Sequence, residues 1–207
     1  MQTIDVDSWK RKEHFEFFQS FEEPYFGSTT NVDVTKAYTF AKSKGISFFL
    51  YYLHAALCAA NTIENFTYRI NEYGQPFICD PIGASATILR ENETFGFSNI
   101  PFHKDFDAFA KAAKTEIARV KSSNSLFPPE DPINVMHCSS LPWLNFTSIT
   151  HARTFQRKDS VPKLSFGKVK EVKGVKTMPL AVYVHHGLVD GLHVGRFVES
   201  FQNLLNA

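Results

Sequence analysis

Two adjacent histidines near the C-terminal end of the chain, His185 and His186, are followed after three residues by Asp190 and Gly191. The apolar residues 181–184 that precede them form a predicted β-strand. A histidine at the end of a buried strand is held firmly. Because an imidazole ordinarily titrates near neutrality, such a side chain can take a proton from a hydroxyl group at physiological pH. The segment therefore indicates general-base chemistry, with Asp190 available to lock the turn by pairing with a cation.

Two other interpretations of this segment stay open at the level of residue types. The histidines can simply end a strand, with Asp190 as an ordinary helix cap. A metal site can also be drawn from His185, His186, Asp190 and His193. Successive residues of a strand point to opposite faces, however, so His185 and His186 do not easily share one ion. We therefore predict no metal site.

The elements that must position these side chains follow from hydrophobic periodicity. It predicts helices at residues 10–21, 36–44, 46–60, 105–121 and 192–206. It predicts strands at residues 3–6, 26–34, 133–138, 146–150, 163–169 and 178–184, with hairpins between residues 66 and 100. Gly45 closes one helix and Ser47 can cap the next. The prediction is an α/β fold, an α+β two-layer sandwich with helices packed on a mixed, largely antiparallel sheet.

Composition narrows the class of protein further. The 207 residues suit a single domain over residues 1–207, and the net charge of +1 with scattered basic residues argues against a nucleic-acid partner. The most apolar stretch, residues 46–60, is shorter than the roughly 20 residues that cross a bilayer, so no membrane partner is predicted. No signal segment is evident and the three cysteines lack a Cys-x-x-Cys pair. We expect a cytoplasmic protein with reduced thiols.

Four segments carry a resemblance to a known family. Residues 185–194 resemble the HHxxxDGxHV signature of chloramphenicol acetyltransferases. Residues 9–17 resemble that family's N-terminal segment, residues 126–128 its LFP loop, and residues 139–146 its SxLPWxNF stretch. The four segments appear in family order over the whole chain, so the sequence is identified as a member of this family.

The resemblance implies the fold of CoA-dependent acyltransferases and acetyl transfer from acetyl-CoA to a hydroxyl of chloramphenicol. His186 is then the general base, and Ser139 stabilises the oxyanion of the tetrahedral intermediate. Acetyl-CoA is a co-substrate, and no cofactor is bound permanently. The two substrates meet in a ternary complex, with no acyl-enzyme intermediate.

The resemblance also implies supporting residues and an assembly. Asp190 pairs with Arg11 to hold the His186 loop rigid, and Nδ1 of His186 bonds to a backbone carbonyl, which leaves Nε2 free. The family forms a homotrimer with active sites at subunit interfaces. Substrate-binding or site-adjacent positions correspond to Phe18, Phe26, Phe95, Phe127, Trp143 and Ser165.

Several acceptor-pocket positions depart from the family's pattern. Phe18 stands where a tyrosine is usual, Ser165 replaces a threonine, and Glu22, His151 and Asp159 replace apolar or aromatic residues. Two alternatives therefore remain beside chloramphenicol acetylation: the same chemistry on a different hydroxyl or amine acceptor, and a non-catalytic trimeric binding protein. A dihydrolipoyl acyltransferase core also carries HxxxDG and ranks lower.

Overall fold

The computed structural model describes residues 2–130, 132–153 and 159–207. The helices are α1 (Lys12–Gln19), α2 (Thr35–Ser43), α3 (Phe48–Asn61), α4 (Glu64–Thr67), α5 (Phe106–Ser122) and α6 (Gly191–Leu205). The strands are β1 (Gln2–Thr3), β2 (Tyr25–Asp33), β3 (Tyr68–Ile70), β4 (Pro76–Ile78), β5 (Gly83–Leu89), β6 (Phe95–Phe97), β7 (Val135–Leu141), β8 (Lys163–Gly167), β9 (Lys170–Val172) and β10 (Val175–His185).

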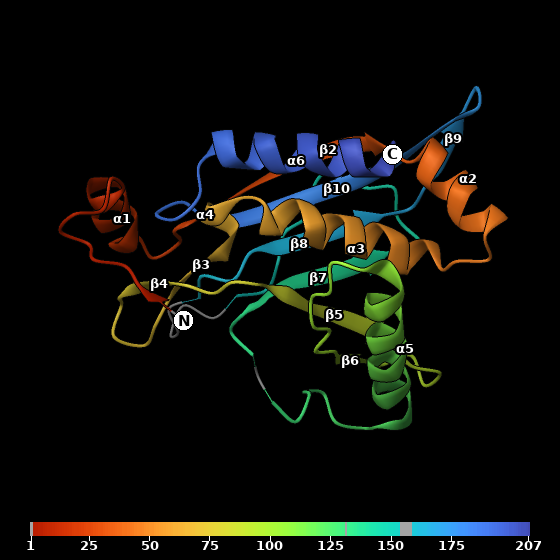
Figure 1. The fold of residues 1–207 in the computed structure, drawn as a ribbon, viewed down its shortest axis with the longest axis horizontal. Helices are drawn as coiled ribbons and strands as arrows, with labels where there is room; N and C mark the ends of the chain where they lie inside the picture. Colours follow the sequence, from red (N-terminus) through yellow and green to blue (C-terminus); the bar gives the residue numbers. More distant parts are fainter. Residues whose placement is uncertain (1, 131, 154–158) are drawn as a thin grey trace.

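The main sheet of the described residues has seven strands in the order β2-β10-β8-β7-β5-β6, with β9 paired to β10. The pairs β2–β10, β10–β8, β9–β10 and β5–β6 are antiparallel, whereas β8–β7 and β7–β5 are parallel. A smaller sheet joins β1, β4 and β3 near the N-terminus (Figure 1). The predicted mixed, largely antiparallel sheet is confirmed.

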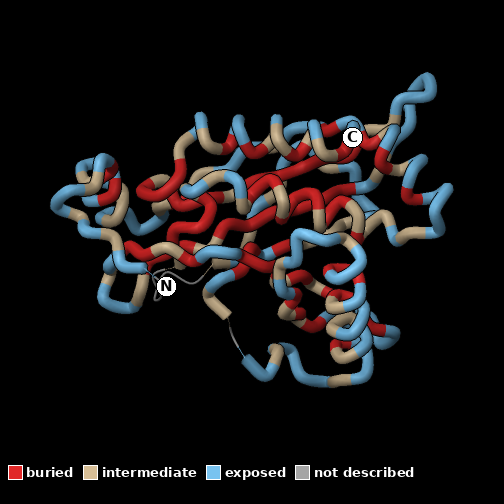
Figure 2. Tube along the Cα trace, viewed as in Figure 1, coloured by how far each residue is buried: buried red, intermediate tan, exposed pale blue. Residues whose placement is uncertain are grey.

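Helices α3 and α6 cover one face of the main sheet, as Figure 1 shows. Both helices bury their apolar stripes against the strands, and the buried residues form one contiguous core (Figure 2). Phe166 of β8 contacts Tyr52 of α3 and Phe201 of α6, which ties the two layers together. Each fully buried side chain of this size contributes about 1.5–3 kcal/mol through apolar burial.

The junction between α2 and α3 follows the predicted local chemistry. Gly45 has a φ of 64°, the left-handed conformation that favours glycine after a helix. The hydroxyl of Ser47 then accepts a hydrogen bond from the N–H of Leu50 at 3.5 Å, so it caps α3 as predicted. Most other predicted helix ends lie within two residues of the observed ends.

The predicted strand at residues 146–150 is wrong, because this segment is a loop. It crosses over β8 instead of pairing with it. The Lys168 N–H donates to the Leu144 carbonyl. The ring of Phe146 packs so closely on Gly167 that a Cβ there would stand only 2.9 Å from it. Phe146 therefore packs against the end of β8 from outside the sheet.

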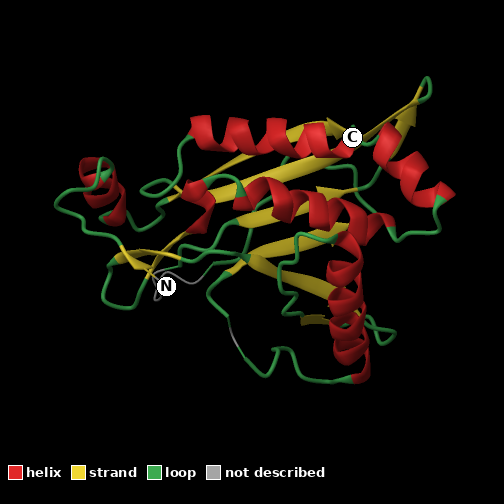
Figure 3. Cartoon of the chain, viewed as in Figure 1, coloured by secondary structure: helices red, strands yellow, loops and turns green. Residues whose placement is uncertain are grey.

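Figure 3 shows the loops that connect the strands of the main sheet to the helices around it. Within the described ranges, no helix is both long and apolar enough to cross a membrane. Across the same residues, no group of three metal-ligating side chains comes together. Cys58, Cys79 and Cys138 are free thiols.

Candidate active site

His186 directly follows β10 and is held between two phenyl rings. Its N–H donates to the Pro24 carbonyl at 2.8 Å, which fixes the backbone. The imidazole stacks on Phe18 with ring centroids 4.0 Å apart and planes 9° apart, and Phe26 packs on it at 4.4 Å. The side chain is still 35% exposed. The ring thus has a fixed orientation and an edge open to a substrate.

Arg11 holds the turn that follows His186. This buried guanidinium donates to both carboxylate oxygens of Asp190, at 2.5 and 2.8 Å, and to the carbonyls of His186 and Gly187, each at 3.3 Å. Hydrogen bonding and charge from Arg11 keep the pKa of Asp190 below its ordinary value, against the opposing effect of burial. The structure thereby brings the predicted Arg11–Asp190 pair together beneath the histidine.

Nδ1 of His186 differs from the arrangement that the resemblance implied. Within the described residues it forms no hydrogen bond to a backbone carbonyl. The His186 carbonyl is instead an acceptor for Arg11, and Nδ1 lies 3.5 Å from Oδ1 of Asp190. The two groups are close enough to interact electrostatically but form no hydrogen bond. A carboxylate accepts and does not donate, so its proximity favours a proton on Nδ1 and a free Nε2.

The neighbouring His185 has a different role. Its ring is buried, and burial lowers its pKa to about 4. Nδ1 of this neutral ring accepts a hydrogen bond from the Gly187 N–H at 3.1 Å. His185 therefore shapes the turn, and His186 is the histidine placed for proton transfer.

Ser139 lies in β7, on the sheet face opposite α3 and α6. The adjacent Ser140 bonds to Tyr52 of α3 at 2.8 Å, and side chains alternate along a strand, so Ser139 must point to the other face. Its partner on β8 is Ser165, whose hydroxyl lies 3.4 Å from Nε2 of His151. A hydroxyl and an imidazole thus flank Ser139 on this face.

The structure does not bring Ser139 and His186 together within one chain. Ser139 is level with Ser165, and Ser165 is level with Ala181 of β10. His186 follows Ala181 by five residues, which is about 16 Å along the sheet, and Ser139 lies two strands away, about 10 Å across. A substrate group of a few atoms therefore cannot contact both Ser139 and His186 of the same subunit.

An aromatic wall, which we define as Phe95, Phe97 and Phe127, stands on the same face as Ser139. Phe95 and Phe127 are 45% and 57% exposed. Phe97 was not among the predicted site residues, but it contacts Phe95 at 5.4 Å and stacks on Phe127 at 5.7 Å. The alternation Phe95-Gly96-Phe97 could have identified it, because it puts both rings on one face of an edge strand. The wall is about 10 Å from Ser139, two strands away.

A cavity of about 540 Å³ lies at the carboxyl ends of β5, β7 and β8, beside the first turn of α3. Its apolar lining includes Phe48, Tyr52, Ile117 and Met178, and Lys121 supplies a cation. Trp143, one of the predicted site residues, lines it and is 64% exposed. Ser140 also lines the cavity, from the α3 side of β7, and its neighbour Ser139 points to the opposite face of the sheet.

The three charged or polar residues that depart from the family's pattern, Glu22, His151 and Asp159, lie in different environments. Glu22 is exposed and Asp159 forms an ion pair with Lys163. His151 is half-buried against Tyr183, and burial lowers its pKa, so its imidazole is neutral near pH 7. Within the described residues, His151 contacts a predicted site residue, Ser165.

Arg11→Ala should lower the free energy of unfolding by about 3 kcal/mol, because it leaves Asp190 and two turn carbonyls without their donor. The depressed pKa of Asp190 means that the pair stabilises the fold fully above the unfolded pKa of about 4 and progressively less below it. Urea unfolding of wild type and variant between pH 3 and 6 measures both effects. The variant should lose part of the acid-side slope. Lys12→Ala, which breaks an exposed pair with Asp7, should leave stability unchanged.

The chain is similar to known proteins over almost its whole length. The family profile described as chloramphenicol acetyltransferase matches residues 1–202. A chloramphenicol acetyltransferase of Proteus mirabilis is 32% identical over 200 residues, covering 96% of this chain and 92% of the relative. That of Bacillus pumilus is 32% identical, with 96% and 91% covered. A solved chloramphenicol acetyltransferase has a TM-score of 0.87 at 34% identity, with 99% of each chain covered.

A truncated catalytic core of the 2-oxoacid dehydrogenase complex from Thermoplasma acidophilum shares the fold alone, with a TM-score of 0.71 at 13% identity and 95% and 94% of the chains covered. The sheet, the histidine that follows its long strand and these relatives together define an acyltransferase. Within that class, the chain belongs to the chloramphenicol acetyltransferase family.

Proposed function

We propose that this protein transfers the acetyl group of acetyl-CoA to a hydroxyl of chloramphenicol in the cytoplasm, with His186 as general base. The observation that carries the proposal is the His186 imidazole, fixed between Phe18 and Phe26 with Nδ1 toward Asp190 and one edge exposed. The relatives that support the choice of acceptor are named chloramphenicol acetyltransferases. Acetyl-CoA is the co-substrate, and no permanently bound cofactor is needed for this chemistry.

Nε2 of His186 takes the proton of the acceptor hydroxyl as its oxygen attacks the thioester carbonyl carbon of acetyl-CoA. The carbonyl oxygen gains negative charge, and the Ser139 hydroxyl donates a hydrogen bond to it. Collapse of the tetrahedral intermediate breaks the carbon–sulfur bond, and the proton on His186 passes to the departing sulfur. The products are the acetyl ester and free CoA thiol, and the enzyme returns to its starting state.

The cavity at the carboxyl ends of β5, β7 and β8 suits the acyl donor. Its apolar lining and volume of about 540 Å³ fit a narrow flexible arm that ends in a thioester, and Ser140, the neighbour of the proposed oxyanion donor, lines it. Lys121 can pair with a phosphate group of the donor. The aromatic wall approaches Ser139 from the other side and fits an aromatic acceptor.

The separation of Ser139 and His186 supports a site shared between subunits. In a cyclic trimer, the face of one subunit that carries Ser139 meets the end of its neighbour that carries His186. Two exposed aromatic side chains, Phe17 of α1 and Phe21 just after it, would be covered by the same contact. Each trimer would then hold three sites, with the base from one subunit and the oxyanion donor from the next.

The experiment that tests the function measures release of CoA thiol from acetyl-CoA with and without chloramphenicol and identifies the product by mass. Chloramphenicol-dependent release with a mass gain of one acetyl group supports the proposal. Release that depends on another hydroxyl or amine acceptor in a survey would replace chloramphenicol, an outcome favoured by the polar His151. Binding of acetyl-CoA with no acceptor supporting release would favour the non-catalytic alternative.

Mixed trimers should restore activity that neither parent has. Subunits with His186→Ala are unfolded and refolded together with an equal amount of Ser139→Ala subunits. A shared site is intact when its His186 comes from a Ser139→Ala subunit and its Ser139 comes from a His186→Ala subunit. Each condition holds for about half of the subunits, so about a quarter of the sites should be active. Thiol release should therefore reach about a quarter of the wild-type rate. No gain above the two parents mixed without refolding would refute a shared site.

A further inference from the structure

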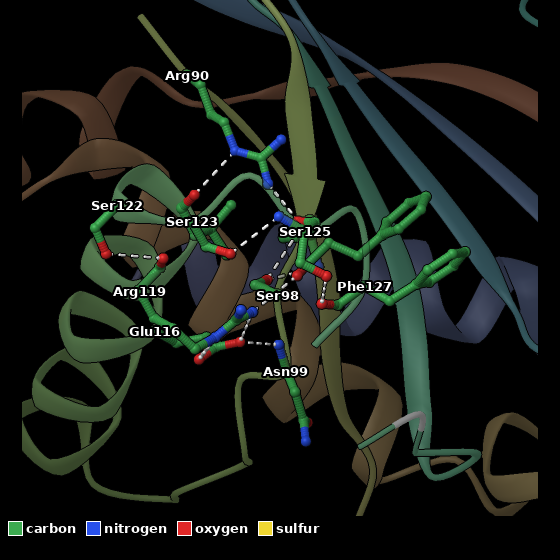
Figure 4. A network of polar contacts seen from close by, with 12 residues as sticks. Arg90, Ser98, Asn99, Glu116, Arg119, Ser122, Ser123, Ser125 and Phe127 are labelled. Carbon is green, nitrogen blue, oxygen red and sulfur yellow. Dashed lines mark hydrogen bonds and ion pairs between the residues drawn. The ribbon is translucent and has the colours of Figure 1, made fainter. Parts of the chain in front are cut away.

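Arg90 lies behind the aromatic wall and is 8% exposed (Figure 4). Its guanidinium donates to the carbonyl of Phe95 at 2.8 Å, to the carbonyl of Ser125 at 2.5 Å and to the carbonyl of Val120 at 3.0 Å. These acceptors belong to β6, to the loop before Phe127 and to the last turn of α5. One side chain thus joins three segments, and two of them carry the phenyl rings of the wall.

The surrounding contacts extend this link to all three rings. Ser125 donates from its hydroxyl to the Phe127 carbonyl at 3.0 Å, and the Phe97 N–H donates to the Leu126 carbonyl at 2.8 Å. Arg119 of α5 donates to the Phe97 carbonyl at 3.1 Å (Figure 4). The guanidinium occupies space that glycine at 96 leaves free, because a Cβ there would stand 2.3 Å from Nη2 of Arg90 and 2.8 Å from Cγ1 of Val120. The position of Arg90 therefore depends on glycine at 96.

The placement of Arg90 matters because the wall is built on weak elements. β6 is a three-residue edge strand, and Phe127 lies in a loop. Neither segment is fixed by a second neighbouring strand among the described residues. Arginine supplies several donors in a fixed planar arrangement, so it can set the distance between the two segments in a way that a single hydrogen bond cannot.

We infer that Arg90 is a positioning residue for acceptor binding, which holds Phe95, Phe97 and Phe127 at the spacing that accepts an aromatic ring. This inference rests on the proposed function. Arg90 touches neither substrate, and its effect reaches the acceptor only through the wall. His186 keeps its own contacts when Arg90 is altered, because these are with Pro24, Phe18 and Phe26.

The test compares wild type with Arg90→Lys, which keeps the charge but loses the fork of donors, and with Gly96→Ala, which displaces the guanidinium without removing it. Both variants should raise KM for chloramphenicol about tenfold, a change of about 1.4 kcal/mol. KM for acetyl-CoA and kcat should stay within about twofold of wild type. The double variant should show no further rise, because both changes remove the same contact.

Arg69→Lys is the matched control. Arg69 is a fully buried arginine whose guanidinium donates to backbone carbonyls, including those of Phe66 and Val135, away from the wall. It should lower the melting temperature without raising KM for chloramphenicol. Unchanged KM in both test variants, or an equal rise with Arg69→Lys, would overturn the inference.

Calorimetric titration of chloramphenicol separates this inference from the proposed function. A wild type that binds chloramphenicol but does not acetylate it would refute the proposed reaction alone, and the dissociation constants of the variants would still test Arg90. About tenfold weaker binding by Arg90→Lys and Gly96→Ala would support the inference. A wild type that does not bind chloramphenicol would overturn both.

Discussion

Replacing His186 with alanine should lower kcat for acetyl transfer by about 10²- to 10⁴-fold, the contribution typical of a positioned general base. The variant loses the proposed base at the end of β10, whereas Arg11 keeps its contacts with Asp190 and the turn carbonyls. Steady-state kinetics of thiol release measures the loss. The melting temperature should change little, because the side chain is partly exposed.

Two further variants separate loss of the base from a disturbed turn. His186→Gln fills part of the space between Phe18 and Phe26 but cannot accept and return a proton near neutral pH, so it should be as inactive as the alanine variant. His14→Ala removes an exposed histidine from α1 and should leave kcat unchanged. Substantial activity in His186→Gln would show that the ring serves only to pack against the phenyl groups.

Ser139→Ala should lower kcat by about 10²- to 10³-fold, the usual effect of removing one oxyanion donor. The hydroxyl acts on charge that develops only in the transition state, so KM for both substrates should change little. Fold stability should be nearly unaffected, because alanine fits the same half-buried position. Initial rates of thiol release at saturating concentrations of both substrates measure kcat of the variant and of the wild type.

The adjacent Ser140 is a close control, since it occupies the same strand and points to the opposite face. Its hydroxyl bonds to Tyr52 at 2.8 Å. Ser140→Ala should cost about 1 kcal/mol of stability through that lost hydrogen bond and leave most of kcat. If Ser140→Ala lost as much kcat as Ser139→Ala, the oxyanion role would have to be reassigned.

Local chemistry made much of the fold predictable. Gly45 and Ser47 marked the end of α2 and the start of α3, and the apolar stripe of Phe109 and Ala113 marked α5. The parallel pairing of β5, β7 and β8 left no such mark, because strand order depends on contacts between segments that are distant in the chain. Residues 146–150 were wrongly predicted to be a strand, since an apolar segment that packs on a sheet has the same residue pattern as a strand within it.

The candidate site was predictable to a different degree at each residue. His186, Arg11 and Asp190 followed from one motif and its partner, and the structure places them in contact. Phe97 was hidden because a sequence rich in phenylalanine offers many core candidates. Arg90 could not be found, since an arginine that follows a strand ordinarily faces solvent, and only the carbonyls of distant segments explain its burial.

If the site is shared between subunits as proposed, the distance between Ser139 and His186 along the sheet means that a folded single chain is inactive, and the first catalytic event waits for assembly. Specific activity should consequently fall when the protein is diluted below the concentration that sustains assembly, with a steeper than proportional loss of total rate. At low expression, catalytic output would then respond to the amount of protein as a threshold rather than as a straight line.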